Sequence, residues 1–434
     1  MLRSFLLLAL SAALLAQQPN QHSKSDPAFE KVPFEQWLSE GVQTGFRWTL
    51  RVTRAELTFH QRLMARIDVG VDGRDLKNRR DHGEIVFFIQ LTDGDGNRYR
   101  DHGSVELGKL DKNIEVANLE YSQPAFFLPG DYRLAVAILD TASGEHSARQ
   151  AQFRVSPPKH DPLSDAWRGL EAVEFIGKAD GPDAWYLPAI RSRLQWAAAA
   201  QSATRLNIIL NVAPSQPVPE SRRGPRATSS ELEALLPTLK ILWQSGSAPI
   251  SEHVELVDLA RRRAVFQQHE IRDLDWPRLK ASLGEANTAS IDIQSLSGRH
   301  HDAQFLVSQA RKLMSASEKP CVLVVLTKPV AFESGEDLEP ISTEGLPACR
   351  VFYIRYRAEA GAARAFSEEM RGRGLGSRRG GPMGPARLPR EAVDQLAATL
   401  KPLRPRVFDV GTPEQMARAI AEVEKALLSS QDYN

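Results

Sequence analysis

Alternating hydrophobic and polar positions dominate the first part of the chain, and this pattern predicts an all-β domain. Segments such as RWTLRV, EIVFFIQLTD and DYRLAVAILD, within residues 45–156, alternate or run apolar over the length of a strand. Turn signals separate these segments, as in the Asp93–Asn97 stretch DGDGN. About six or seven short strands in roughly 110 residues favour a β-sandwich.

One tyrosine sharpens this prediction. Tyr132 stands just inside a predicted strand, directly after the turn at Gly130-Asp131. This placement resembles the tyrosine corner of immunoglobulin-like sandwiches, in which the hydroxyl bonds back to upstream backbone. The alternative is an ordinary half-buried strand tyrosine. The resemblance implies an immunoglobulin-like fold for this domain.

The pattern changes after residues 157–204, which we interpret as a linker with a lead-in strand. From there to residue 430, apolar runs such as RLNIILNV and CVLVVLT alternate with helical patterns such as DAQFLVSQARKLMSA. The last predicted helix begins with Thr412 as its cap and Pro413 at its first position. Residues 205–430 are therefore predicted to form an α/β domain, with a doubly wound, mostly parallel sheet between helices.

The first residues have the layout of a secretory signal peptide. One arginine precedes an apolar run from Phe5 to Leu15, which ends at Ala16 before polar sequence and is short for a bilayer crossing. We expect a signal peptide at 1–16 and a polar segment with a short helix at 17–44. The alternative is an apolar first helix of a soluble fold. Export to the periplasm or the cell exterior follows from the first interpretation.

Charge narrows the choice of partner. The formal net charge is +1, from 55 basic and 54 acidic residues, which argues against dedicated binding of nucleic acid or anionic membranes. No later segment is long and apolar enough to predict a transmembrane span in the mature chain. Residues 371–390 are rich in Gly, Pro and Arg, so we expect a mobile, solvated insertion there. A basic tract that touches nucleic acid is the alternative.

Candidate chemistry lies at two strand ends. In open α/β sheets, ligands bind beyond the carboxyl ends of the strands, near the point where strand order reverses. The run LNIIL ends in Asn211 to Ser215, and the run VLVVL ends in Thr327 to Pro329.

At these residues the second domain resembles a von Willebrand factor type A domain. The predicted order of a strand, a helix, a two-stranded hairpin, helices and then further strands agrees over about Arg205 to Leu428. The whole arrangement resembles the von Willebrand factor A-related proteins of acidobacterial genomes. Such domains often bind a divalent metal through Asp-x-Ser-x-Ser after the first strand, a threonine in a middle loop, and Thr-Asp-Gly after the fourth strand.

The chain departs from that metal-binding pattern at most points. The corresponding positions carry Asn211, Ala213, Ser215, Thr288, Thr327, Lys328 and Pro329. An amide replaces the first carboxylate, and the ammonium of Lys328 replaces the second, so Mg²⁺ would be repelled by several kcal/mol at low effective dielectric. We therefore predict no metal and no cofactor. The expected binding rim of this degenerate site is Asn211, Ser215, Thr288, Thr327 and Lys328.

Two interpretations of Lys328 remain open at this point. Its ammonium either receives an acidic group of a partner near the vacated metal position, or it is an exposed loop lysine without a role.

The same resemblance places Cys321 and Cys349, the chain's two cysteines, at the start of neighbouring strands. Parallel neighbours lie about 4.8 Å apart, which a disulfide can span. Two buried free thiols are the alternative, because side-by-side strand pairs strain a disulfide.

Enzyme signatures are weak throughout the chain. The sequence contains no Gly-x-Ser-x-Gly elbow, no phosphate loop, and no Gly-x-Gly-x-x-Gly after a strand. We therefore expect an exported, non-catalytic adhesion or scaffold protein that binds another envelope or extracellular protein. A metal-dependent adhesion module with atypical ligands and a hydrolase with an unrecognised site are the alternatives.

Overall fold

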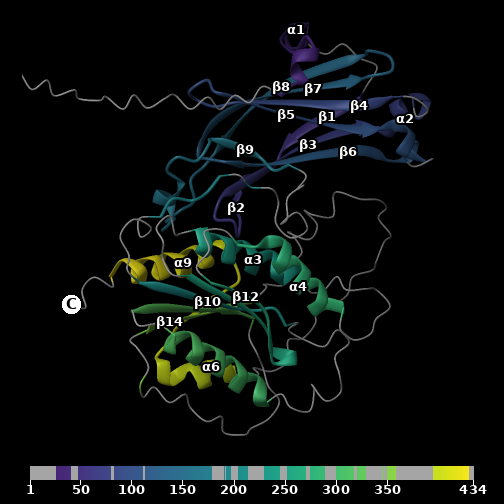
Figure 1. Ribbon diagram of the computed structural model, residues 1–434. Coiled ribbons are helices and arrows are strands. Elements are labelled where there is room, and N and C mark those ends of the chain that lie inside the picture. Colours follow the sequence, from purple (N-terminus) through teal and green to yellow (C-terminus); the bar gives the residue numbers. More distant parts are fainter. Residues whose placement is uncertain are drawn as a thin grey trace, which may run out of the picture.

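The computed structural model of the chain combines two antiparallel sheets with a third, mostly parallel sheet that helices flank (Figure 1). The predicted signal peptide at 1–16 and the predicted insertion at 371–390 lie outside the described residues. The structure describes residues 26–40, 47–79, 83–110, 113–177, 190, 192–196, 204–213, 229–244, 252–269, 274–288, 300–316, 320–328, 345, 349–357 and 394–429.

The two antiparallel sheets form the first domain. One runs in the order β1-β3-β6-β9, with β2 paired to β3, and the other in the order β5-β4-β7-β8. The strands of the first sheet are β1 (Trp48–Val52), β2 (Glu56–Leu57), β3 (Leu63–Asp72), β6 (Asn118–Phe127) and β9 (Val173–Phe175). The strands of the second sheet are β4 (Glu84–Thr92), β5 (Arg98–Glu106), β7 (Gly130–Asp140) and β8 (His146–Val155).

A shared core joins the inner faces of these two sheets. Successive side chains of a strand point to opposite faces, and Ile85, Phe87 and Ile89 of β4 are fully buried on the inner side. The ring of Phe87 stacks on Tyr121 of β6, with centroids 4.4 Å apart. The alternation in the sequence therefore corresponds to a core between two sheets.

Tyr132 makes the backbone contact that a tyrosine corner requires. The side chain is 3% exposed. Its hydroxyl donates to the carbonyl of Leu128 at 2.7 Å and lies 3.1 Å from the carbonyl of Ala172. The hydroxyl thus joins the start of β7 to the residues just before β9.

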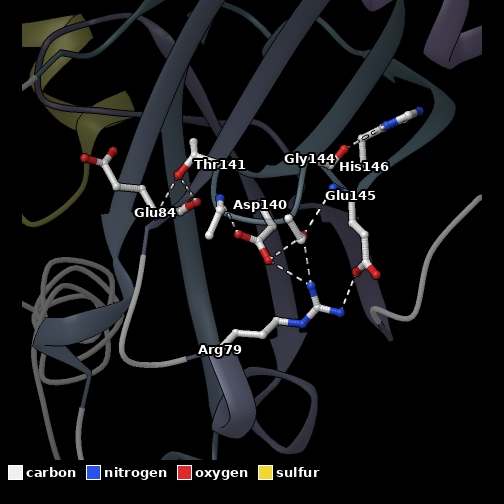
Figure 2. A network of polar contacts seen from close by, with 9 residues as sticks. Arg79, Glu84, Asp140, Thr141, Gly144, Glu145 and His146 are labelled. Atoms are coloured by element: carbon white, nitrogen blue, oxygen red, sulfur yellow. Dashed lines mark hydrogen bonds and ion pairs between the residues drawn. The ribbon is translucent and has the colours of Figure 1, made fainter.

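Asp140 holds the opposite end of β7, where the chain turns into β8 (Figure 2). Its carboxylate accepts from Arg79 Nη1 at 2.8 Å, from Ser143 Oγ at 2.8 Å and from the Ala142 amide at 2.9 Å. Burial alone would raise the pKa of Asp140, but the hydrogen bonds from Arg79 and Ser143 lower it below its usual value. Arg79 also pairs with Glu145. These contacts fix a turn that carries no candidate chemistry.

Part of the segment predicted as a linker belongs to the sandwich. Val173–Phe175 forms β9, which pairs with β6 in antiparallel fashion. Trp167 and Leu163 are also buried in the core that the two sheets share. The first domain therefore extends beyond residue 156, the boundary that the sequence pattern suggests.

The second domain contains the mostly parallel sheet, in the order β12-β11-β10-β13-β14-β15. Its strands are β10 (Arg205–Asn211), β11 (Glu252–Asp258), β12 (Arg263–His269), β13 (Cys321–Thr327), β14 (Cys349–Tyr356) and β15 (Arg406–Val410). Only β12 of these runs antiparallel to its neighbour. In chain order this is the arrangement 3-2-1-4-5-6, the doubly wound order.

Helices cover both faces of this sheet. The layer with α3, α4 and α9 shares a buried cluster with the sandwich, and α6 and α8 pack on the opposite face (Figure 1). The α-helices among the described residues are α1 (Phe34–Glu40), α2 (Gly73–Leu76), α3 (Ser229–Gln244), α4 (Trp276–Thr288), α6 (His300–Ser315), α8 (Gln395–Leu400) and α9 (Pro413–Leu428). Among the described residues, no helix has the length and apolarity for a membrane crossing.

The turn between β2 and β3 joins the two domains. Gln61, at a φ of 55°, donates from Nε2 to the carbonyl of Pro413 at the start of α9, at 3.3 Å. The ring of Phe59 meets that of Tyr356 edge-on, with centroids 5.5 Å apart. Trp167 Nε1 donates to the Gln61 carbonyl at 2.9 Å. These contacts bring one turn of the sandwich onto α9 and the end of β14.

Charged groups lie buried beside this junction. Arg62, 3% exposed, forms an ion pair with Glu174, 7% exposed. Next to it, His60 packs edge-on against Phe126, with ring centroids 5.7 Å apart. Burial lowers the pKa of His60 to about 3, and the positive charges of Lys240 and Arg62 add to this effect. The histidine is therefore neutral at the junction in the physiological range of pH.

Candidate functional site

The carboxyl edge of the parallel sheet contains the switch point of the second domain. The chain leaves β10 toward β11 on one side, and β13 returns on the other side of β10. Ligands of doubly wound sheets bind beyond the strand ends at this point. Asn211 ends β10 and Thr327 ends β13, so the structure brings these two predicted site residues together.

The side chains of Asn211 and Thr327 are hydrogen-bonded to each other. Asn211 Nδ2 donates to Thr327 Oγ1 at 2.9 Å, and that hydroxyl donates to the carbonyl of Lys328 at 2.9 Å. Asn211 Oδ1 accepts the amide of Ala213 at 3.0 Å. Both side chains are buried, at 3% and 0% exposure. The polar groups at the switch point therefore satisfy one another across the two strands.

Lys328 is buried at 3% exposure, so its interpretation as an exposed loop lysine is wrong. The side chain follows directly on a strand whose seven residues are all buried. A charged ammonium is costly to bury unless it is paired, and this lysine takes part in at least one further polar interaction. A partner's acidic group has little access to an ammonium that is covered in this way.

Two predicted rim residues have no described side chain. Ser215 lies outside the described residues, and Thr288 is the last residue of α4, where only the backbone is described. Of the predicted rim, the structure thus assembles Asn211, Thr327 and Lys328.

These residues do not fit a divalent metal. Mg²⁺ requires hard oxygen ligands with free lone pairs, usually carboxylates. The amide of Asn211 directs its nitrogen at Thr327, whose hydroxyl proton is directed at a carbonyl. The buried Lys328 adds a positive charge beside them. Within the described residues, no group of three or more His, Cys, Asp or Glu side chains is arranged to hold a metal ion.

The polar row continues into the next two strands, which the sequence analysis missed. Thr327 lies opposite Arg355 of β14, and Arg355 lies opposite Asp409 of β15. Arg355 donates from Nη2 to Asp409 Oδ2 at 2.6 Å and from Nη1 to Asp394 Oδ2 at 2.7 Å. Asp394 also caps α8 by accepting the Ala397 amide. The charges at this edge are therefore engaged with one another.

Tyr353 completes this group on the α6 side of the sheet. Its hydroxyl lies 3.1 Å from Asp394 Oδ2, and the side chain is fully buried. Burial raises the pKa of Tyr353 well above its usual value, and the nearby carboxylate of Asp394 raises it further. The phenol is therefore protonated and serves as a hydrogen-bond donor, with no role as a base.

A second polar cluster lies nearer the amino end of the sheet, on the side of β11 and β12. His253 Nδ1 lies 2.5 Å from His269 Nδ1, and Gln267 Nε2 donates to Glu255 Oε1 at 3.0 Å. His253 and Glu255 are buried at 2% and 0% exposure. Asn207, opposite His253 in register, is also fully buried, and its side-chain amide has no hydrogen-bond partner among the residues that the structure describes. A buried amide without partners is a cost to stability.

The cysteines lie at the opposite end of the strands from the switch point. Cys321 and Cys349 are directly opposite one another in β13 and β14, with Cα atoms 4.5 Å apart, and they form a disulfide. The bridge links β13 and β14 where they begin, whereas at their other ends Thr327 is hydrogen-bonded to Asn211 of β10 and Arg355 to Asp409 of β15.

Comparisons with known proteins add little to this picture. No family model and no curated protein matches the chain. Among solved structures 23 chains match. One, a structural genomics target designated SoR45, is 14% identical, with 27% of this chain and 91% of that chain covered and a TM-score of 0.18. A Bordetella pertussis protein designated ApaA is 18% identical, with 26% and 96% covered and a TM-score of 0.18. TM-scores of this size carry no argument about fold or function.

Proposed function

We propose that the chain is an exported, non-catalytic scaffold or adhesion protein that binds another envelope or extracellular protein without a metal. The observation that carries this proposal is the closure of the switch point. The hydrogen bond between Asn211 and Thr327 and the buried Lys328 occupy the place where a metal-dependent domain needs carboxylate ligands.

The proposal includes two family-level assignments. The first domain is an immunoglobulin-like sandwich, which the hydroxyl contact of Tyr132 with the Leu128 carbonyl supports. The second domain is of the von Willebrand factor A type with a degenerate metal site. Its strand order, with β12 as an antiparallel edge strand, supports this assignment.

Export is the third part of the proposal. A disulfide between Cys321 and Cys349 persists in oxidising compartments and is rare in the cytosol. The bridge thus agrees with the signal-peptide layout of the first residues. Sequencing of the N-terminus of protein recovered from the periplasm and the medium tests this part, and an intact Met1 on cytosolic protein contradicts it.

Isothermal titration calorimetry with Mg²⁺ and Mn²⁺ tests the proposal that the chain binds no divalent metal. We expect no heat of binding at micromolar metal, and the same trace from a Ser215→Ala variant. Micromolar binding that Ser215→Ala abolishes would instead assign the chain to the metal-dependent adhesion modules.

Capture from envelope extracts, repeated with EDTA and with Mg²⁺, tests the binding function itself. We expect one partner to be retained equally under both conditions. Loss of the partner in EDTA contradicts the proposal, and turnover of an ester or peptide substrate by the purified chain would favour the hydrolase alternative.

A further inference from the structure

An N-terminal strap, residues 26–40, lies across the outer face of the sheet β5-β4-β7-β8 and contains α1 (Figure 1). Three aromatic side chains of the strap, Phe29, Phe34 and Trp37, are buried at 5% exposure or less. They surround Phe88 of β4, with ring centroids 5.2, 6.5 and 6.1 Å from its ring. The strap thus buries aromatic groups on the solvent side of the sandwich.

The face beneath the strap carries a strip of small side chains beside Phe88, and we call this strip the trough. Phe88 lies opposite Ala137 of β7, and Ala137 lies opposite Ala148 of β8. Ala135 stands on the same face, two residues before Ala137. The three alanines are buried at 8% exposure or less. Because alanine side chains are short, this part of the sheet leaves room for large aromatic groups from outside.

One wall of the trough is basic and meets acidic residues of the strap. Arg98, Arg100 and His102 alternate along β5, so they share its outer face. Glu35 lies 2.9 Å from Arg98 and 3.6 Å from Arg100, and Asp26 Oδ2 lies 2.5 Å from His102 Nδ1. The Arg100 guanidinium also lies over the Phe29 ring, 5.0 Å from its centroid.

The other wall of the trough, formed by β8, also contacts one aromatic ring and one carboxylate of the strap. The Trp37 ring stacks on His146 of β8, with centroids 4.6 Å apart and planes at 20°. His146 Nε2 lies 3.4 Å from Glu40 Oε2. On each wall, a basic side chain therefore packs on an aromatic ring of the strap, and a basic side chain lies beside one of its carboxylates.

Side chains hold the strap in place. Its backbone hydrogen bonds among the described residues are local, as from Phe29 to Asp26 and from Trp37 to Pro33. No ladder of backbone bonds between the strap and β5 or β8 occurs within the described residues. Such contacts are typical of an amphipathic segment that binds in a groove, in which anchors at helical spacing fill the apolar floor.

We propose that this face is a docking site for an acidic, aromatic segment of a partner protein, and that the strap occupies it in cis as a competitor. A strap tethered in cis acts at an effective concentration in the mM range, so it weakens the apparent affinity for a free segment by about 100-fold, the lower end of the gain that tethering gives. The docking face lies on the other domain from the carboxyl edge, so its test does not depend on the metal titration.

A fluorescent synthetic peptide of residues 26–40 is the probe, and the full chain is the receptor. We expect the Phe34→Ala, Trp37→Ala double variant, whose own strap is weakened, to bind the peptide about 100-fold more tightly than the wild type. An added Arg100→Glu substitution is expected to lower this affinity at least tenfold, because it reverses the charge of one wall. Equal binding with and without Arg100→Glu, or no binding to a folded double variant, overturns the proposal.

Amide hydrogen exchange on the wild type covers the case in which the double variant does not fold. We expect amides of the strap to exchange by local opening, well before those of β4 and β7. Strap amides that exchange only on global unfolding refute a displaceable strap. Sedimentation of the wild type tests whether a second copy of the chain, and not a separate partner, binds this face. A dimer that the double substitution abolishes would assign the face to a second copy of the chain and overturn the assignment to a separate partner.

Discussion

The hydrogen bond between Asn211 and Thr327 is the feature that closes the switch point, so its removal gives the most direct test of the site. Thr327→Val keeps the shape of the side chain and removes the hydroxyl. That hydroxyl accepts from Asn211 Nδ2 at 2.9 Å and donates to the Lys328 carbonyl at 2.9 Å. The substitution therefore removes two hydrogen bonds in a region that excludes water.

The expected cost follows from these two bonds and the group that they leave behind. Each bond contributes about 1 kcal/mol net, and a buried donor without an acceptor costs about 1–3 kcal/mol. Asn211, 3% exposed, has no access to water as a substitute acceptor. The lost bond to the Lys328 carbonyl and the Asn211 donor left without an acceptor together should lower the free energy of unfolding of Thr327→Val by about 2–4 kcal/mol. Asn211→Ala should cost a similar amount, because it also removes the bond to the Ala213 amide.

A double-mutant cycle measured by urea unfolding isolates the interaction. Because each single variant already breaks the shared bond, the double variant should be more stable than the sum of the two losses predicts, by about 1 kcal/mol or more. Fluorescence and circular dichroism should be compared, since a two-domain chain can unfold in steps. Ser308→Ala is the control, because the exposed Ser308 hydroxyl bonds only locally, to Phe305 at 2.7 Å. Additive losses, or a Thr327→Val effect no larger than that of the control, would refute the closed site.

Two further substitutions and the reduction of the disulfide test other parts of the structure. Tyr132→Phe should cost about 1 kcal/mol in unfolding experiments, because it removes the hydrogen bond from the buried hydroxyl to the half-buried Leu128 carbonyl. Loss of the Cys321–Cys349 bridge, which spans 28 residues of sequence, should cost about 3 kcal/mol in a thermal melt with reductant. The pKa of His60 is lowered to about 3, so protons favour the unfolded state below pH 6.5, and stability falls as pH drops. His60→Gln should remove up to about 2 kcal/mol of the loss between pH 7 and pH 5.

Each of these three predictions has its own control or contradicting result. Tyr121→Phe removes a half-buried hydroxyl that lies 3.1 Å from the Gln123 side chain, and it should cost less than Tyr132→Phe because it leaves no backbone carbonyl of a strand end without its donor. A Cys321→Ala, Cys349→Ala chain should melt at the same temperature with and without reductant, and two thiols that alkylate in the native protein would contradict the bridge. Parallel pH profiles of wild type and His60→Gln would show that His60 is not the titrating group.

Local sequence patterns predicted several elements because the physics behind them is local. The run CVLVVLT corresponds to β13, in which every residue is buried. The predicted cap at Thr412 and the first-turn proline correspond to the start of α9, with a capping box between Thr412 and Gln415. Apolar runs and caps of this kind are decided by neighbours a few residues apart.

Elements that depend on distant contacts were missed. β9 is a strand of three residues, too short for a periodic pattern, and it exists because β6 offers it an edge. Arg355 and Asp394 are 39 residues apart in sequence, and only the placement of the α8 cap brings them to 2.7 Å. Lys328 is buried at 3% exposure, although lysines are mostly exposed, and no local pattern in the sequence encodes this burial.

The closed edge and the strap together favour a binding surface on the first domain. At one end of β13 and β14 a disulfide joins the strands, and at the other end the polar row from Asn211 to Asp409 is engaged internally. An interface that uses Asn211 and Thr327 would have to break a buried hydrogen bond that water cannot replace. The sandwich trough, in contrast, is already complementary to an aromatic and acidic segment, and within the described residues side-chain contacts hold the strap on it. The proposed partner would therefore bind at the trough in place of the strap, and not at the strand ends where the fold class alone would place a ligand.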